Sequence, residues 1–147
     1  MRSPVHGLRS SVALAALMFA ATVTTSTLAQ EKNAWSGVYT AAQAERGMKR
    51  YEENCGACHG ADLMGGPGVP GLAGAEFLFN YNNLTAADVF DFVKKNMPPG
   101  QQGSLNDQQY IDIVAAMFKA NEFAAGDVEL TPDLQALKQV RITRAKP

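Results

Sequence analysis

The sequence predicts an all-α domain, with three main helices and one long loop between the first and the second. Three stretches carry apolar residues at spacings of three and four, which places these residues on one face of a helix. Each stretch begins behind a residue pattern that is typical of helix caps. We find no stretch with the strict alternation of a half-buried strand. The expected helices span about residues 41–54, 86–95 and 106–120.

The first expected helix starts behind Thr40, which forms a capping-box pattern with Gln43. A glycine in a helix interior costs about 1 kcal/mol relative to alanine. Gly47 therefore indicates either a second helix crossing close by or a tolerated surface position, and the sequence leaves both open. The apolar face of this helix consists of Ala44, Gly47, Met48, Tyr51 and then Cys55.

The end of this helix runs into Cys55-Gly-Ala-Cys58-His59, the C-x-x-C-H attachment sequence of a covalently bound c-type haem. On one helical turn both thiols and the imidazole lie on the same side. Cys55 and Cys58 are thus expected to attach one haem c, and His59 to bind its iron. A zinc site would need a fourth ligand, yet His6 is the chain's one other histidine and no other cysteine exists. A dithiol oxidoreductase would need a βαβ context that is missing.

Residues 60–84 show little periodicity and contain a glycine- and proline-rich run at 65–71. A loop of about 25 residues is unusual in a compact domain. We expect this loop to pack on the haem, and a low-complexity linker is the alternative. Its apolar residues favour packing: Leu63, Leu72, Phe77, Leu78, Phe79 and Tyr81.

The second helix is expected behind Thr85, with Asp88 as its capping partner, and Pro98 and Pro99 prevent its continuation. The third helix has the clearest apolar face, and Ser104 with Asp107 is its expected capping pair. A short fourth helix is expected after Thr131-Pro132. The face of the third helix consists of Tyr110, Ile113, Val114, Met117 and Phe118.

The sixth ligand of the iron follows by elimination among the methionines. Met48 precedes the attachment site on the same helix, and Met117 belongs to an expected core face. Met64 lies so close to His59 in sequence that it would hardly reach the opposite haem face. Met97 follows a helix end and precedes two prolines, which places a flexible thioether on a stiff segment. Met97 is therefore the predicted ligand.

Residues 1–29 have the features of a cleaved secretory signal. Arg2 and Arg9 supply a positive start, residues 12–21 are apolar, and residues 27–29 end in a small side chain. The apolar run is shorter than the roughly 20 residues that span a bilayer, so an uncleaved anchor is the lesser alternative. The signal predicts a periplasmic protein without stable membrane insertion.

Removing this signal takes away two arginines and no acidic residue, so the formal net charge falls from −1 to −3. The remaining chain suits one domain. No basic run exists, which argues against nucleic acid as a partner. Lys94 and Lys95 lie beside the predicted ligand. They are outside candidates for the iron ligand, relevant mainly at alkaline pH, where an amine loses its proton. The pair is otherwise expected to form either a small docking patch or an ordinary solvated helix end.

The motifs at residues 55–60 and 96–100, Cys-Gly-Ala-Cys-His-Gly and Asn-Met-Pro-Pro-Gly, make the chain resemble a class I c-type cytochrome. The resemblance covers about residues 39–121 and extends to the small soluble bacterial periplasmic monohaem proteins. It implies the cytochrome c fold, with three main helices and a haem-packing loop. It also implies that the first and third helices cross at a glycine–aromatic contact, matching Gly47 and Tyr51 here.

The resemblance further implies a proline whose carbonyl accepts the N–H of the haem histidine. Pro70 fits that place best and Pro67 is the second candidate. Such a bond fixes the imidazole and raises its basicity. Tyr81 matches an aromatic position near a haem propionate. The chain departs from the family late in the third helix, where Ala115-Ala116 replace an expected aromatic residue.

The expected domains are the signal at 1–29, the cytochrome c domain at 30–121 and a C-terminal extension at 122–147. Residues 129–133 are similar to the tails of small periplasmic cytochromes associated with quinone-cofactor alcohol dehydrogenases. A helix lying over the domain surface is the favoured alternative for this extension.

A thioether and an imidazole saturate the iron and favour Fe(II), which leaves one-electron transfer as the expected chemistry. The sequence therefore predicts a monomeric periplasmic electron carrier that is not an enzyme. A dehydrogenase would be its donor, and a terminal oxidase or another cytochrome its acceptor. The alternatives are a subunit bound to a periplasmic dehydrogenase, and a haem enzyme or sensor if Met97 does not bind the iron.

Overall fold

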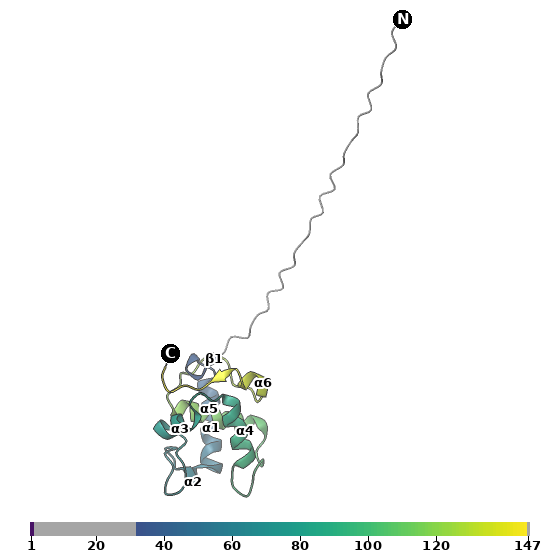
Figure 1. Ribbon diagram of the computed structural model, residues 1–147. Coiled ribbons are helices and arrows are strands. Elements are labelled where there is room, and N and C mark those ends of the chain that lie inside the picture. The colour runs from purple at the N-terminus through teal and green to yellow at the C-terminus, as the bar shows by residue number, and fades with distance from the viewer. Residues whose placement is uncertain (2–31, 147) are drawn as a thin grey trace.

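The computed structural model describes Met1 and residues 32–146, and the predicted signal at 1–29 falls outside the described residues. Helices dominate, and α2 lies at the opposite end of the molecule from β1, β2 and α6 (Figure 1). No described helix combines the length and the apolar character that a membrane crossing requires. The elements are β1 (Lys32–Asn33), a 3-10 turn (Ala34–Ser36), α1 (Ala41–Asn54), α2 (Gly56–His59), α3 (Gly74–Tyr81), α4 (Ala86–Asn96), α5 (Asp107–Ala120), α6 (Leu134–Leu137) and β2 (Val140–Arg141).

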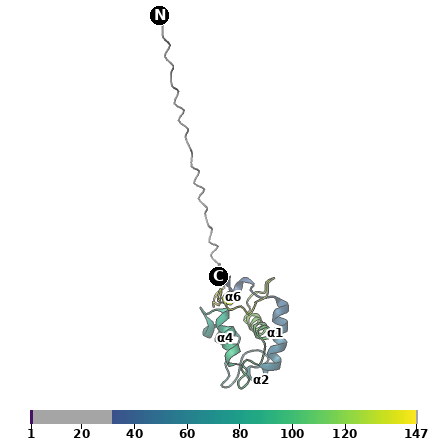
Figure 2. The same ribbon diagram turned by 90° about the vertical axis from the view of Figure 1, so that its right-hand side faces the viewer.

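The helix α5 forms the centre of the fold, and all its residues from Tyr110 to Phe118 are buried. Figure 2 views it almost along its axis, with α4 and α1 on either side. Its contact with α1 is so close that a Cβ atom on Gly47 would lie 1.7 Å from the carbonyl oxygen of Asp112. The glycine is therefore required by the helix crossing. The nearest neighbours of such a Cβ atom are main-chain atoms of Asp112 and Ile113 in α5.

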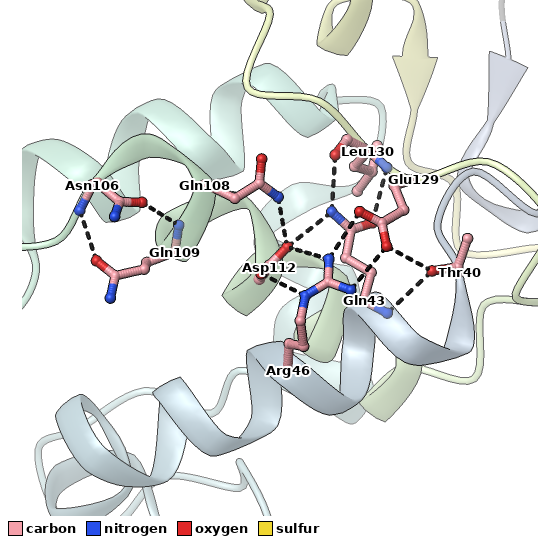
Figure 3. Close-up of polar contacts among 9 residues, drawn as sticks. All are labelled: Thr40, Gln43, Arg46, Asn106, Gln108, Gln109, Asp112, Glu129 and Leu130. Carbon is pink, nitrogen blue, oxygen red and sulfur yellow. Dashed lines mark hydrogen bonds and ion pairs between the residues drawn. The ribbon is translucent and has the colours of Figure 1, made fainter.

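The predicted N-terminal caps are correct for two of the three main helices. The Thr40 hydroxyl accepts the N–H of Gln43 at 3.1 Å, and Thr85 with Asp88 forms a complete capping box. The predicted pair Ser104 and Asp107 is wrong, because Asn106, two residues after Ser104, is the N-cap of α5. Asn106 exchanges two 2.9 Å hydrogen bonds with Gln109 (Figure 3), and asparagine is among the strongest N-cap residues.

The loop at 60–84 contains a helix that the sequence did not predict. The helix α3 buries a single residue, Phe77, whose ring packs on Tyr81 one turn later at a centroid distance of 4.8 Å. Phe79, on the same helix, is 72% exposed. One buried position and an exposed phenylalanine produce no amphipathic repeat, which is why the periodicity was uninformative here.

Two short strands also lie outside the prediction. Strands β1 and β2 pair in parallel, with Lys32 opposite Val140 and Asn33 opposite Arg141. Strands of two residues are too short to show alternation, so the expectation of no strand was wrong for a physical reason. The expected fourth helix is present as α6, although Asp133 caps it in place of Thr131.

The C-terminal segment, residues 122–146, packs into the same hydrophobic core as α1, α4 and α5. A buried side chain joins it to α1: the amide of Gln43 pairs with both main-chain polar groups of Leu130, at 2.8 and 2.9 Å. Beside this pair the Arg46 guanidinium contacts Asp112 at 3.2 Å and Glu129 at 2.8 Å (Figure 3). The buried side chains of the segment are Phe123, Leu130, Leu137, Val140 and Ile142.

Candidate haem-binding site

A pocket of about 680 Å³ opens between α2, the loop that follows it, and helices α3, α4 and α5. The six residues that the sequence predicts for the haem site all line this pocket. They lie up to 42 positions apart in the chain, from Cys55 to Met97. Cys58 and His59 lie in α2, whereas the others come from different parts of the chain. The lining includes Cys55, Cys58, His59, Val69, Pro70, Leu72, Tyr81, Phe92, Val93, Met97, Ile113 and Met117.

The attachment sequence forms a single tight turn at the end of α1. The N–H of Cys55 donates to Tyr51 at 2.7 Å and closes α1, and the N–H of His59 donates to Cys55 at 2.9 Å. Cys55 and Cys58 form no disulfide; Cys55 is half-buried and Cys58 is exposed. Burial, with a smaller contribution from Cys58, raises the pKa of Cys55 to about 11. Both sulfurs and the imidazole thus line one pocket from one turn.

The imidazole of His59 is almost fully buried and makes a hydrogen bond through one ring nitrogen. Its Nδ1 lies 2.9 Å from the carbonyl oxygen of Pro70. A carbonyl can only accept a hydrogen bond, so Nδ1 carries the proton in this contact. Nε2 is then the ring nitrogen that is left free to bind a metal, and the hydrogen bond fixes the orientation of the ring.

The turn that presents Pro70 is built around a glycine. Gly65 has a φ of +74°, and a Cβ atom there would lie 2.4 Å from the carbonyl oxygen of Val69. Gly66 and Val69 exchange two 2.9 Å main-chain hydrogen bonds beside it. The N–H of Gly65 also donates to His59 at 2.8 Å. The proline carbonyl and the histidine are therefore held by the same short segment.

Asn121, which sequence reasoning did not single out, anchors the far end of this loop. Its side chain is buried and donates to the carbonyl of Leu72 at 3.0 Å, while it accepts the N–H of Gly74 at 2.9 Å. A lone asparagine after a helix is typical of an ordinary helix end. The sequence therefore carried no signal for this long-range role.

Met97 is the residue at which α4 ends. Its N–H donates to Val93 at 2.9 Å, and its carbonyl accepts the Tyr110 hydroxyl at 2.9 Å. Met117 lines the pocket as well, from the centre of α5, although the sequence assigned it to the core alone. Met48 and Met64 are not among the lining residues.

Tyr81 contributes its half-buried side chain to the pocket wall from the last turn of α3. Burial raises the pKa of its hydroxyl above the ordinary value. The phenol is therefore a neutral hydrogen-bond donor at physiological pH.

The residues around the pocket fit a haem c. Aliphatic and aromatic side chains form most of its wall, two thiols stand at one edge, and one imidazole and one thioether supply nitrogen and sulfur donors. Among the described residues, no three His, Cys, Asp or Glu side chains gather closely enough to hold a metal ion. An apolar wall with one imidazole and one thioether suits iron within a large flat apolar cofactor.

Comparisons with known proteins agree with this fit. A family model described as cytochrome c oxidase, cbb3-type, subunit III, matches residues 42–116, just over half of the chain. A crystal structure of the sulfane dehydrogenase SoxCD from Paracoccus pantotrophus contains a chain with the same fold, at a TM-score of 0.54 and 22% identity. The match covers 74% of this chain and 61% of that one. No curated protein matches the sequence. The chain belongs to the family of cytochrome c domains that this model describes, a fold of helices built around a covalently bound haem.

Proposed function

We propose that the protein is a periplasmic monohaem electron carrier in which His59 and Met97 bind the haem iron. The observation that carries this proposal is the contact between Nδ1 of His59 and the carbonyl of Pro70, at 2.9 Å. It orients an unprotonated Nε2 within a pocket that also contains a thioether. The export signal predicted at 1–29 supplies the compartment.

Each site residue has a distinct task in this proposal. Cys55 and Cys58 attach the cofactor covalently, so it stays bound in a dilute compartment. When bound, the haem supplies an iron that gains or loses one electron, and nitrogen–thioether ligation favours Fe(II). Pro70 orients His59, and Tyr81 offers a neutral hydroxyl at the pocket wall. The apolar wall excludes water and lowers the dielectric around the charge.

The proposed partners are redox proteins that dock briefly at the pocket rim, with a periplasmic dehydrogenase as donor and a terminal oxidase or another cytochrome as acceptor. Phe92 lines the pocket and is 49% exposed, which supports an apolar rim. Lys94 and Lys95 are engaged in ion pairs with Asp107 at 2.6 Å and Asp91 at 2.7 Å. Their charges are locally balanced, which argues against a strong cationic docking patch.

A second candidate is a cytochrome subunit that remains bound to a periplasmic dehydrogenase, such as a quinone-cofactor alcohol dehydrogenase. It is favoured by the shared fold with a chain of the sulfane dehydrogenase crystal structure. A bound subunit would co-purify with a partner through size-exclusion chromatography at physiological salt. A carrier is expected to elute as a monomer.

Carbon monoxide binding tests the carrier against a haem enzyme or gas sensor. In the carrier both axial positions are occupied, so the ferrous protein is expected to show no spectral change under carbon monoxide at neutral pH. The variant Met97→Ala is expected to bind it readily. Rapid binding by the unmodified protein would reject the carrier and favour an enzyme or sensor.

A further inference from the structure

The hydroxyl of Tyr110 contacts the main chain of the proposed ligand residue, Met97. Tyr110 lies in the first half of α5, three and seven residues before the pocket-lining Ile113 and Met117, and its side chain is 1% exposed. The hydroxyl donates to the main-chain carbonyl of Met97 at 2.9 Å. This bond joins the proposed ligand residue directly to the central helix.

Met97 has few other polar attachments. Its N–H donates back to Val93 within α4, and the following residue, Pro98, has no N–H to give. A second link between α4 and α5 is the ion pair of Lys94 with Asp107, in which both side chains are more than a third exposed. Exposed pairs contribute little. The Tyr110 hydroxyl is therefore the buried polar link from the Met97 peptide to α5.

We propose that Tyr110 is a positioning residue that holds Met97 in place as an iron ligand. This inference rests on the His59 and Met97 ligation proposed above. If Met97 is to leave the iron, its peptide has to move away from α5 and lose the hydroxyl. Without the hydroxyl, the carbonyl stays unpaired while the site is closed, whereas water satisfies it once the segment opens. Loss of the Tyr110 hydroxyl therefore favours the state in which the Met97 segment has moved away from α5.

Imidazole titration of the ferric holoprotein measures this opening, because imidazole reaches the iron when Met97 leaves it. In Tyr110→Phe we expect the far-red sulfur–iron band to be present before titration and imidazole to bind about 3- to 10-fold more tightly than in wild type, the range of one net hydrogen bond. The matched control is Tyr39→Phe, which removes another buried hydroxyl that donates to a main-chain carbonyl, that of Phe123. Its imidazole affinity is expected to equal that of wild type.

Two further variants separate positioning from general loosening of the fold. In a Met97→Ala background no ligand has to leave, so adding Tyr110→Phe should not change imidazole affinity. Lys94→Gln removes the exposed ion pair and is expected to shift affinity less than twofold. Equal affinities for Tyr110→Phe and Tyr39→Phe, an unchanged effect in the Met97→Ala background, or a Lys94→Gln shift as large as that of Tyr110→Phe would each overturn the role.

The first spectrum, recorded before imidazole is added, separates failure of the ligation from failure of this inference. A wild-type protein without the sulfur–iron band would overturn the Met97 ligation, and the role of Tyr110 with it. A wild-type protein with the band, combined with no selective effect of Tyr110→Phe, would overturn the role of Tyr110 alone.

Discussion

Single side chains in this protein are constrained mainly by close backbone approaches and by buried polar contacts. Gly47 allows α1 to reach the backbone of α5, and Pro70 supplies a carbonyl to His59. Asn121 joins two main-chain groups of the haem loop. Because few other side chains could make these contacts, substitutions at these positions test the contacts directly.

Gly47→Ala is expected to lower the free energy of unfolding of the holoprotein by at least about 3 kcal/mol, because its Cβ would overlap the Asp112 carbonyl oxygen. Gly66→Ala is the matched control, since a Cβ there meets nothing within 4 Å. Urea titration followed by tryptophan fluorescence measures both. Equal stabilities of the two variants would contradict the helix crossing.

Asn121→Ala is expected to cost about 1 to 3 kcal/mol in unfolding free energy, because it leaves partly buried main-chain groups of Leu72 and Gly74 without this partner. Asn54→Ala is the control, because the partly exposed Asn54 side chain donates locally, to the carbonyl of Arg50 one turn earlier in α1. Thermal unfolding followed by circular dichroism compares them. If Asn54→Ala lost as much stability as Asn121→Ala, the Asn121 contacts would be no more important than a local hydrogen bond.

At the scale of elements, the C-terminal segment is held to α1 by the Gln43, Arg46 and Glu129 contacts in Figure 3. The hydrogen bond from Arg46 lowers the pKa of Glu129. A carboxyl group whose pKa is lower in the folded than in the unfolded protein stabilises the fold at pH values above its unfolded pKa, which is near 4.3. That contribution is lost as the pH falls through the folded pKa.

Glu129→Gln is therefore expected to reduce unfolding free energy at pH 7, with a difference from wild type that shrinks as the pH falls below about 4. The reduction should be modest because both side chains are partly exposed. Urea titrations at a series of pH values measure the difference. A difference that grows toward low pH would have the wrong sign for this ion pair.

The elements also show what the sequence revealed and what it did not. Long helices with capped ends, such as 86–95, were predictable from local spacing, because α4 carries its signal within its own residues. The residues at 55–59 revealed their chemistry for the same reason. The start of α3, the strand pair and the role of Gln43 depend on contacts with segments far along the chain. The local sequence pattern of a segment does not indicate such distant partners.

Residues of α2 line the candidate haem pocket. At the opposite end of the molecule the C-terminal segment pairs with β1 through β2 (Figure 1). The rim of the pocket includes Phe92, which is 49% exposed. Lysines at that rim are paired with aspartates, and the chain is slightly acidic overall. Long-range steering should therefore be weak.

The rate of electron exchange with a small redox protein is expected to change less than about threefold as ionic strength rises from about 0.01 to about 0.15 M. Stopped-flow spectroscopy at the haem band measures it. A lysine-to-glutamine variant at position 95 should show the same salt profile as wild type. A collapse of the rate with added salt would mean that charged patches, not the apolar rim, guide docking.

The central claim is that Met97, rather than the second pocket methionine, completes the iron coordination opposite His59. The most direct measurement is the optical spectrum of the exported ferric holoprotein at neutral pH, compared with those of Met97→Ala and Met117→Leu. We expect a low-spin spectrum with the weak far-red sulfur–iron band. This band should be lost in Met97→Ala and kept in Met117→Leu. A high-spin wild type, or a band that disappears with Met117 instead, would contradict it.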